Sequence, residues 1–474
     1  MAQETFSKSE ATTQAKRINL KGVTMNGDGN EEQVNHEKTG AVMVVGGGIS
    51  GMQSALDLAN SGFKVYLVEE ATSIGGRMAQ LDKTFPTNDC SMCMISPKLI
   101  EVVKHNNIEI ITSARVESVE GKEGNFQVSV LKKPRYIDEN KCSGCGDCVE
   151  SCPVMLPNEF EQGLNVRKAT YKRYPQAIPD AMAISKAKRP PCKLNCPAGC
   201  NGQGYIALIS QGKYVEALDH IKQWIPLPAV LGRVCYHPCE LQCNRNEVDE
   251  PIGITPLKRF VADHVRKQRE GGLVPLEDKP VIDPSKPKIA IVGAGPSGLT
   301  CASDLAKHGY PITIFESSSK PGGQLQLTIP RYRLPEDVLA AEIRDIIDIG
   351  IELKLNTPIG ADSSLNDLRA QGYKAIFLAI GAQKSTSLSI PGEDLQGVRP
   401  ALDFLRDVNL GKKIKIGKKV VIIGGGNVAV DAARTILRLG AEVCIIYRRT
   451  EAEMPASPEE IEGAREEGIK FQFL

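Results

Sequence analysis

The sequence predicts an α/β protein of several domains, because glycine-rich turns follow apolar runs at three places and cysteines gather between the first two. At 474 residues the chain is longer than one hydrophobic core normally serves, so roughly three domains are expected. The 58 Lys and Arg residues nearly balance the 57 Asp and Glu residues, which argues against a nucleic-acid-binding protein. No apolar run approaches the roughly 18 residues of a membrane span, so none is expected.

Residues 1–39 are polar and aperiodic, which predicts a disordered leader. They lack the apolar core of a secretory signal. The chain has 14 cysteines, most of them in C-x2-C or C-x3-C spacings. In a long chain such spacings favour metal binding over a disulfide framework, and they fit a reducing, cytoplasmic location.

The first glycine turn lies in residues 41–70, which read as strand, turn, helix and strand of a Rossmann-type unit. The glycines permit a tight turn and a close approach of the backbone to a pyrophosphate. An acid at the end of the second strand can accept hydrogen bonds from a ribose, and a glycine pair follows it. The candidate binding residues here are Gly46, Gly48, Gly51, Glu69, Gly75 and Gly76.

The same three elements recur at identical offsets in residues 288–323. One G-x-G-x-x-G run is weak evidence, but chance must supply ten glycines and two acids in register to produce this repeat. An acid followed by a glycine pair is similar to the FAD-binding signature of two-dinucleotide flavoproteins, so both units are predicted to bind FAD. The second set of candidates is Gly293, Gly295, Gly298, Glu316, Gly322 and Gly323.

A third unit begins in "KKVVIIGGGNVAVDAARTILRLGAEVCIIYRR" and has no glycine pair after it. Two arginines stand just beyond the position that the acid occupies in the other units. An arginine there can neutralise a ribose 2′-phosphate, which favours NADP(H), although solvated arginines are the alternative. The candidate residues are Gly424, Gly426, Ala429, Arg448 and Arg449.

A ferredoxin-like run stands at residues 141–153, with the spacing C-x2-C-x2-C-x3-C-P. This spacing predicts thiolate ligands of a [4Fe–4S] cluster, and in two-cluster ferredoxins the fourth cysteine serves the other cluster. No second run of this kind occurs in the chain. The candidate ligands are Cys142, Cys145, Cys148 and Cys152.

A second cysteine group consists of two trios with a spacing of four. Neighbouring prolines interrupt helix, so these cysteines are expected in loops at helix ends, with an α-helical hairpin over residues 205–224 between them. Four thiolates would suit zinc, but the flavin units beside them favour iron–sulfur chemistry. The candidate ligands are Cys192, Cys196, Cys200, Cys235, Cys239 and Cys243.

Cys90 and Cys93 follow the first glycine pair in "NDCSMCMISPKL". Three interpretations stay open for them. They could ligate a further cluster, form a redox-active pair near the flavin, or be inert thiols.

Residues 40 to about 185 resemble the A subunit of CoB–CoM heterodisulfide reductase. The resemblance is carried by the first glycine turn, by "GGRMAQLDKTFPTNDCSMCMISPKL", by the ferredoxin run and by "NEFEQGLNVRKATYKRYPQAIP". It implies a flavin and iron–sulfur electron-transfer role.

Residues from about 186 onward resemble the NADPH-dependent glutamate synthase small subunit together with its relatives. These include the large subunit of NADH-dependent ferredoxin:NADP oxidoreductase and the N-terminal part of dihydropyrimidine dehydrogenase. The resemblance is carried by the helical cysteines, "GAGPSGL", "GGQLQLTIPRYRLP", "LAIGA" and "GGGNVAVDAARTI".

Two departures from these relatives matter. They usually have a further C-x2-C pair upstream of Cys192, and several use Glu or Gln as a cluster ligand where this chain has Lys258. Since both the ferredoxin run and the helical group look incomplete, we expect Cys152 and the helical thiolates to complete two clusters between them. Both flavin units also lack the late closing segment of their fold, which suggests that one module is inserted into the other within a longer protein.

The predicted architecture is α/β and multidomain, with Rossmann-type FAD- and NAD(P)-binding units, a ferredoxin-like insertion and an α-helical iron–sulfur domain. The expected function is electron transfer between NADPH, FAD and [4Fe–4S] clusters, to ferredoxin or a heterodisulfide reductase-type subunit. Electron bifurcation is compatible with the resemblance. The alternatives are an inactive N-terminal fragment and a non-catalytic electron-wiring subunit. No residue is assigned as an acid–base catalyst.

The expected domains are 1–39 leader, 40–135 FAD-binding, 136–185 ferredoxin-like, 186–280 α-helical iron–sulfur, 281–410 FAD-binding and 411–474 NADP(H)-binding.

Overall fold

The computed structural model describes residues 40–122, 124–186, 189–275, 279–360 and 363–473, together with two short strands before residue 40. The chain divides into two compact units. The N-terminal unit is Met1–Arg189 with Glu247–Asp249, and the C-terminal unit is Pro190–Asn246 with Glu250–Leu474. Within the described ranges, no helix combines the length and the apolar character needed to cross a bilayer.

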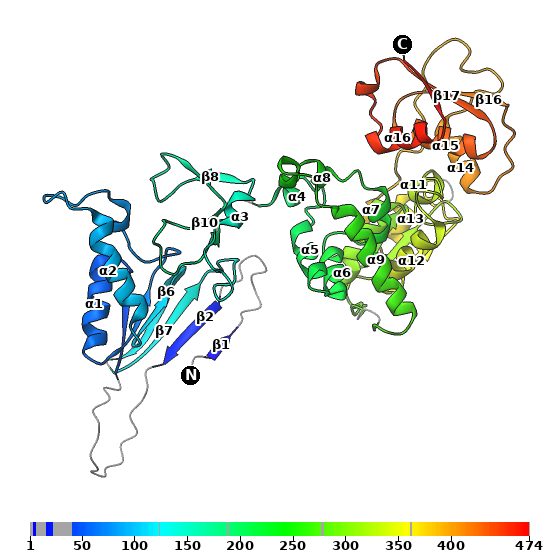
Figure 1. The fold of residues 1–474 in the computed structure, drawn as a ribbon. Coiled ribbons are helices and arrows are strands. Elements are labelled where there is room, and N and C mark those ends of the chain that lie inside the picture. The colour runs from blue at the N-terminus through cyan, green and yellow to red at the C-terminus, as the bar shows by residue number, and fades with distance from the viewer. Residues whose placement is uncertain are drawn as a thin grey trace. The chain divides into compact units, whose positions relative to one another are not determined.

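The N-terminal unit contains a parallel sheet with strand order β3-β4-β5, and α1 and α2 pack together beside it (Figure 1). Its core joins Met52 of α1 and Leu67 of β4 to Ile95 of α2, as expected for apolar residues at helical and strand spacing. The predicted order of strand, turn, helix and strand is confirmed. The bounds are β3 (Ala41–Val45), α1 (Ile49–Asn60), β4 (Lys64–Val68), η1 (Met78–Gln80), α2 (Ser91–Lys104) and β5 (Ile108–Ile111).

A second, antiparallel sheet of this unit has the order β1-β2-β7-β6. The expectation that residues 1–39 lack regular structure is wrong for two segments, since β2 pairs with β7 and places Ile18 opposite Val130. Pairing with a distant strand is a non-local effect that six residues of sequence do not announce. The rest of the leader lies outside the described residues. The bounds are β1 (Gln3–Thr5), β2 (Lys16–Lys21), β6 (Ala114–Lys122) and β7 (Asn125–Lys132).

The ferredoxin-like segment follows β7 and forms two small antiparallel pairs, β8-β9 and β10-β11. One short helix, α3, begins after Gly146, whose φ of 97° is in the left-handed region. The bounds are α3 (Asp147–Glu150), β8 (Met155–Pro157), β9 (Val166–Lys168), β10 (Thr170–Tyr171) and β11 (Ala183–Ile184).

The C-terminal unit begins with an all-helical region. The predicted hairpin is confirmed as α5 and α6, and prolines stand at the starts of α4, α7 and α8, where a missing N–H costs no hydrogen bond. The bounds are α4 (Pro191–Leu194), α5 (Gly202–Ser210), α6 (Tyr214–Lys222), α7 (Pro228–Val234), α8 (Pro238–Leu241), η2 (Asn244–Glu247) and α9 (Ile254–Glu270).

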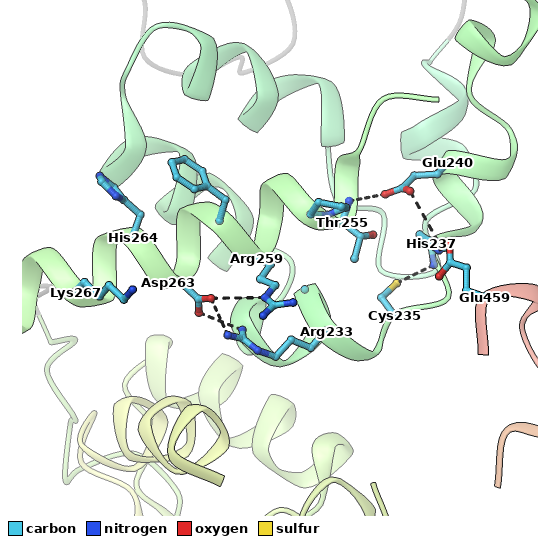
Figure 2. A pocket seen from close by; sticks show the side chains of 13 residues that line it. Arg233, Cys235, His237, Glu240, Thr255, Arg259, Asp263, His264, Lys267 and Glu459 are labelled. Atoms are coloured by element: carbon cyan, nitrogen blue, oxygen red, sulfur yellow. Dashed lines mark hydrogen bonds and ion pairs between the residues drawn. The ribbon is translucent and has the colours of Figure 1, made fainter. Parts of the chain in front are cut away.

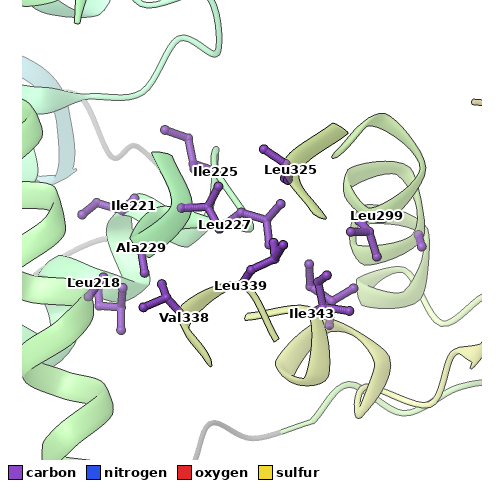
Figure 3. Close-up of a cluster of buried hydrophobic side chains, with 14 of the residues drawn as sticks. Leu218, Ile221, Ile225, Leu227, Ala229, Leu299, Leu325, Val338, Leu339 and Ile343 are labelled. Atoms are coloured by element: carbon purple, nitrogen blue, oxygen red, sulfur yellow. The ribbon is translucent and has the colours of Figure 1, made fainter. Parts of the chain in front are cut away.

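The second glycine turn belongs to a four-stranded parallel sheet with the order β14-β13-β12-β15. One continuous core joins this fold to the helical region, because Leu218 and Ile221 of α6 and Leu227 belong to the same buried cluster as Leu299 and Leu339 (Figure 3). The bounds are β12 (Ile289–Val292), α10 (Pro296–Lys307), β13 (Ile312–Phe315), α11 (Gln324–Leu327), α12 (Glu336–Ile347), β14 (Glu352–Lys354), α13 (Leu365–Ala370) and β15 (Ala375–Leu378).

The third glycine turn belongs to a parallel sheet with the order β16-β17-β18 and its own core. The last strand, β18, pairs in parallel with β17. The bounds are α14 (Ala401–Asn409), β16 (Lys419–Ile423), α15 (Asn427–Arg438), β17 (Glu442–Tyr447), η3 (Glu451–Glu453), α16 (Pro458–Glu466) and β18 (Lys470–Phe473).

Candidate functional site: flavin turns and thiol clusters

The first glycine turn connects β3 to α1. The Gly46 N–H donates to the Val68 carbonyl at 2.7 Å, and the φ of Gly46 is 103°. A Cβ at Gly51 would lie 1.9 Å from the Gly46 carbonyl oxygen, so no larger residue fits there. The Glu69 carboxylate accepts the Gly47 N–H at 2.6 Å and the Ala71 N–H at 2.8 Å. The acid therefore fixes the turn and leaves the backbone open to a pyrophosphate.

The second glycine turn repeats this geometry between β12 and α10. The Gly293 N–H donates to the Phe315 carbonyl at 2.7 Å, and a Cβ at Gly298 would lie 2.0 Å from the Gly293 carbonyl oxygen. Glu316 is buried, and it accepts the Ala294 N–H at 2.7 Å and the Ser318 N–H at 2.8 Å. The repeat in the sequence is thus a repeat in hydrogen bonding.

The glycine pairs also occupy equivalent places. A Cβ at Gly76 would lie 2.7 Å from the Gly48 Cα, and a Cβ at Gly323 would lie 2.8 Å from the Gly295 Cα. Gly76 and Gly323 both have a φ of 55°. Each pair therefore packs backbone against backbone on the turn, and a side chain would separate them.

A pocket of 390 Å³ lies at the first turn and is lined by Glu69 and Gly76. Three other lining residues, Glu159, Gln162 and Arg173, come from the ferredoxin-like segment. These three residues were not assigned from the sequence. Their only signal was the position of "NEFEQGLNVRKATYKRYP" next to the cysteine run.

The ferredoxin-like segment is held on the first flavin-type fold by buried polar contacts. Tyr174 donates its hydroxyl hydrogen to the Ile74 carbonyl at 2.5 Å, and burial raises the pKa of Tyr174 to about 12. Arg135 is also buried, and it donates to the carbonyls of Thr72 and Ala181. These bonds fix the residues that precede the first glycine pair.

The third glycine turn connects β16 to α15. The Gly424 N–H donates to the Ile446 carbonyl at 3.0 Å, and a Cβ at Gly425 would lie 2.7 Å from the Tyr447 ring. The ring therefore occupies the place that a carboxylate takes in the other two units. Arg448 and Arg449 are exposed just beyond the end of β17.

The four cysteines of the ferredoxin run lie in and around α3. Cys142, Cys145 and Cys148 interact electrostatically, and Cys142 Sγ accepts the Met182 N–H at 3.4 Å. Burial opposes ionisation of Cys152, but hydrogen bonds that include the Thr170 backbone lower the pKa of its thiol. Donors aimed at sulfur stabilise thiolates, so this set suits a thiolate-bound cluster.

The six helical cysteines lie at the ends of short helices, and Cys200 and Cys239 are buried. Cys200 interacts electrostatically with Cys196, Cys239 and Cys192, and Cys192 interacts with Cys243. Cys235 stands at the C-terminal end of α7, and its Sγ accepts the His237 N–H at 3.4 Å. These thiols share one region of the C-terminal unit.

In the described part of the chain, no three His, Cys, Asp or Glu side chains are arranged to hold a single metal ion. The donor set itself fits iron–sulfur clusters, because it offers sulfur ligands and backbone groups that form hydrogen bonds with Cys142, Cys152 and Cys235. The assignment of the ten cysteines as ligands stays a prediction, as does the sharing of clusters between Cys152 and the helical thiols.

Cys90 and Cys93 form a disulfide at the start of α2. Of the three interpretations of this pair, a redox-active pair agrees best with the bond.

A pocket of 520 Å³ lies between α7 and α9, beside Cys235 (Figure 2). Arg233 donates to both carboxylate oxygens of Asp263, at 3.1 and 2.7 Å, which balances part of the positive charge of the pocket. This pocket could not be identified from the sequence, because its residues come from separate helices. Its charged lining is Arg233, Glu240, Arg259, Asp263, Lys267 and Glu459, and His237 and His264 also line it.

Four family models match parts of the chain. Residues 41–135 match the FAD-dependent oxidoreductase family, and residues 135–155 match the 4Fe–4S binding domain. Residues 159–270 match domain II of dihydropyrimidine dehydrogenase, a 4Fe–4S cluster domain. Residues 287–474 match the pyridine nucleotide-disulphide oxidoreductase family.

Curated relatives match the two parts of the chain separately. The NADP(+)-dependent formate dehydrogenase subunit beta of Moorella thermoacetica is 44% identical over 305 residues, 60% of this chain and 43% of that protein. The NADPH-Fe(3+) oxidoreductase subunit beta of Geobacter sulfurreducens is 43% identical over 289 residues, 60% of this chain and 42% of that protein.

The first part matches the H(2):CoB-CoM heterodisulfide,ferredoxin reductase of Methanothermobacter thermautotrophicus. The A subunit of that enzyme is 58% identical over 144 residues, 30% of this chain and 22% of that protein. The chain thus spans less than half the length of each of these relatives. One part of the chain is similar to the A subunit of the heterodisulfide reductase, and another part is similar to the two beta subunits.

Proposed function

We propose that the chain passes electrons between NADPH and a redox-protein partner, through bound FAD and [4Fe–4S] clusters. The observation that carries this proposal is the pair of glycine turns with the same hydrogen bonds, one at Glu69 and one at Glu316. A third turn without the acid, followed by two exposed arginines, supplies the expected nicotinamide site.

At each flavin turn the chain would supply backbone N–H groups and the positive end of a helix to the pyrophosphate. Glu69 and Glu316 hold their turns in shape and stand where a ribose hydroxyl can be recognised. When bound, FAD would exchange a hydride with the nicotinamide and single electrons with the clusters.

At the third turn, Arg448 and Arg449 would select NADPH by pairing with the 2′-phosphate. The close packing of Gly425 on Tyr447 keeps the turn tight where no carboxylate is present. This arrangement favours a phosphorylated ribose, because no acid stands there to repel it.

The ten cysteines would hold the clusters, and the exposed Cys145 and Cys148 would place one cluster close to the protein surface. The partner would then be ferredoxin or a heterodisulfide reductase-type subunit, since the curated relatives are named as subunits of larger oxidoreductases. We also propose the domain boundaries given above and a cytoplasmic location.

The first experiment is an anaerobic NADPH titration of the purified chain, followed by visible absorbance. Bleaching of the flavin band together with loss of the broad cluster absorbance supports the path from NADPH to the clusters. Clusters that do not respond to NADPH, in a chain that holds FAD, would indicate an electron-wiring role only. Absence of both cofactors would indicate an inactive fragment.

A double variant tests the nicotinamide site. R448A/R449A should weaken NADPH binding at least about tenfold and leave NADH binding nearly unchanged, since a charged hydrogen bond contributes about 1.5–3 kcal/mol. The matched control is K413A/K415A, which removes two exposed lysines from the same module. Equal loss of NADPH and NADH binding would contradict the assignment of the two arginines.

A further inference from the structure

Lys258 is a charged residue in a core position. It lies on α9, and the buried positions of this helix are Ile254, Thr255, Lys258, Val261, Ala262 and Val265. The side chain of Lys258 is only 5% exposed, and every other residue of this stripe is apolar or a threonine. A lysine is rarely buried to this extent unless an anion balances its charge.

The surroundings of Lys258 contain thiols. Its ammonium interacts electrostatically with Cys200 and Cys239, which are themselves buried. Cys200 and Cys239 also belong to the same buried cluster as Ile254 and Val261, which flank Lys258 on the buried face of α9.

Carboxylates do not fill the role of counter-ion. Among the residues that the structure describes, no ion pair joins Lys258 to an Asp or Glu. The acid beside Cys239 is Glu240, and its Oε1 accepts the Thr255 N–H at 2.5 Å. Because Lys258 as a whole is only 5% exposed, its ammonium has little water around it and no carboxylate to balance its charge.

We propose that Lys258 is the counter-cation of an iron–sulfur cluster held by thiolates that include Cys200 and Cys239, and that it raises the reduction potential of this cluster. The inference rests on the proposed iron–sulfur role of the helical cysteines. A cluster bound by thiolates is an anion, and reduction adds one more negative charge. A fixed cation beside it therefore stabilises the reduced form more than the oxidised form.

The test is a potentiometric titration followed by electron paramagnetic resonance, on the full chain prepared without oxygen. C239S first identifies the signal of the helical cluster as the one that is lost. Lys258→Met should then make reduction of that cluster at least tenfold less favourable. For a one-electron reduction, this lowers the midpoint potential by at least 59 mV. The signal of the ferredoxin-run cluster should not move, and it serves as an internal reference.

Two further variants separate charge from packing. Lys258→Arg keeps the charge, so the equilibrium constant for reduction of the cluster should change less than twofold. Lys267→Met removes an exposed lysine from the same helix, about 13 Å away along the axis, and should leave the potential unchanged. If Lys258→Met fails to fold by circular dichroism, the neutral Lys258→Gln replaces it in the same comparison.

The outcomes are distinct. If Lys258→Met is folded but loses the cluster while Lys258→Arg keeps it, the counter-cation role is supported. If both variants lose the cluster, or if Lys258→Met keeps the wild-type potential, the inference is wrong and the proposed function stands. If the wild-type chain binds no iron or sulfide at these cysteines, the inference and the cluster part of the proposed function fail together.

Discussion

The two flavin-type folds share one turn but differ in the strand that carries it. In the C-terminal unit β12 lies between β13 and β15, and all four of its residues are buried. In the N-terminal unit β3 pairs only with β4 among the described strands, and Val45 at its end is 67% exposed. Even so, the hydrogen bonds of Glu69 and Glu316 to their turns agree.

This contrast separates local from non-local causes. The geometry of the turn follows from glycines and an acid at fixed spacing, and it forms with or without a second neighbouring strand. Burial of the strand depends on a segment that is distant in the sequence. A Cβ at Gly293 would lie 2.3 Å from the carbonyl oxygen of Ala379, which follows β15. A Cβ at Gly46 would have no atom within 4 Å.

The largest expected effect on stability comes from adding a Cβ to the third glycine of each flavin turn. Gly298→Ala and Gly51→Ala each place a Cβ about 2 Å from a backbone oxygen that cannot move aside, so each should cost about 3 kcal/mol or more of unfolding free energy. The loss should be greater for Gly298→Ala, because its strand lies inside a buried sheet. Denaturant unfolding and flavin content measure both variants.

Gly295→Ala is the matched control for the fold. Its Cβ would lie 3.8 Å from the nearest atom, the Gly323 Cα, so stability should change little while FAD binding weakens. A Gly295→Ala variant as unstable as Gly298→Ala would show that the close contact at Gly298 is not the cause.

The second prediction concerns how the flavin-type fold of the C-terminal unit holds the helical cysteine region. In the C-terminal unit the buried Glu342 of α12 accepts the N–H groups of Ala229 and Val230 at the start of α7, and burial raises its pKa to about 7. Its contribution to stability should therefore be complete below about pH 4.5 and should fall as the pH rises to about 7, by ~3 kcal/mol.

Glu342→Gln removes this titration, so the stability difference between wild type and variant should shrink from pH 5 to pH 7.5. Denaturant unfolding at the two pH values measures it. Glu336→Gln is the control, because hydrogen bonding from Lys320 lowers the pKa of the exposed Glu336 and its titration is complete before pH 5. A constant difference for Glu342→Gln would refute the assignment.

The third prediction compares the two acids directly. Glu316→Gln should lower the free energy of unfolding by about 1–3 kcal/mol. The Glu316 carboxylate now accepts two backbone N–H groups, and the amide NH2 of Gln would face one of these donors. Glu69→Gln should cost less, because Glu69 is only partly buried. Urea unfolding midpoints test the order, and a larger loss for Glu69→Gln would mean that burial does not set the difference.

The smallest effect is expected for the contact of the ferredoxin-like segment. Tyr174→Phe leaves the Ile74 carbonyl without its donor and should cost about 1 kcal/mol. Tyr171→Phe, in the same segment, should cost less than about 0.5 kcal/mol, because Tyr171 presents its ring to Arg167. Thermal melting compares the two, and equal losses would contradict a role for the Tyr174 hydroxyl.

The fold was predictable from the sequence where the signal was local. Glycine spacing fixed the three turns, and helical periodicity fixed α5 and α6. The residues that lock segments together were not predictable, because they lie far apart in the chain. Tyr174 contacts Ile74, and Glu342 caps a helix that begins at Pro228. Lys258 was noticeable only as a departure from related sequences, since its burial depends on how α9 packs.

The continuous core of the C-terminal unit also constrains how this protein is made. Leu218 and Ile221 of α6 share one apolar interior with Leu299 and Leu339, which the ribosome adds much later (Figure 3). Segments that share a core fold together rather than in sequence. The cysteines between Cys192 and Cys243 should therefore wait as unfolded thiols until the flavin-binding sheet has been synthesised. Under the proposed assignment of these cysteines as cluster ligands, iron and sulfide would reach them late in biogenesis, in the same interval as the flavin.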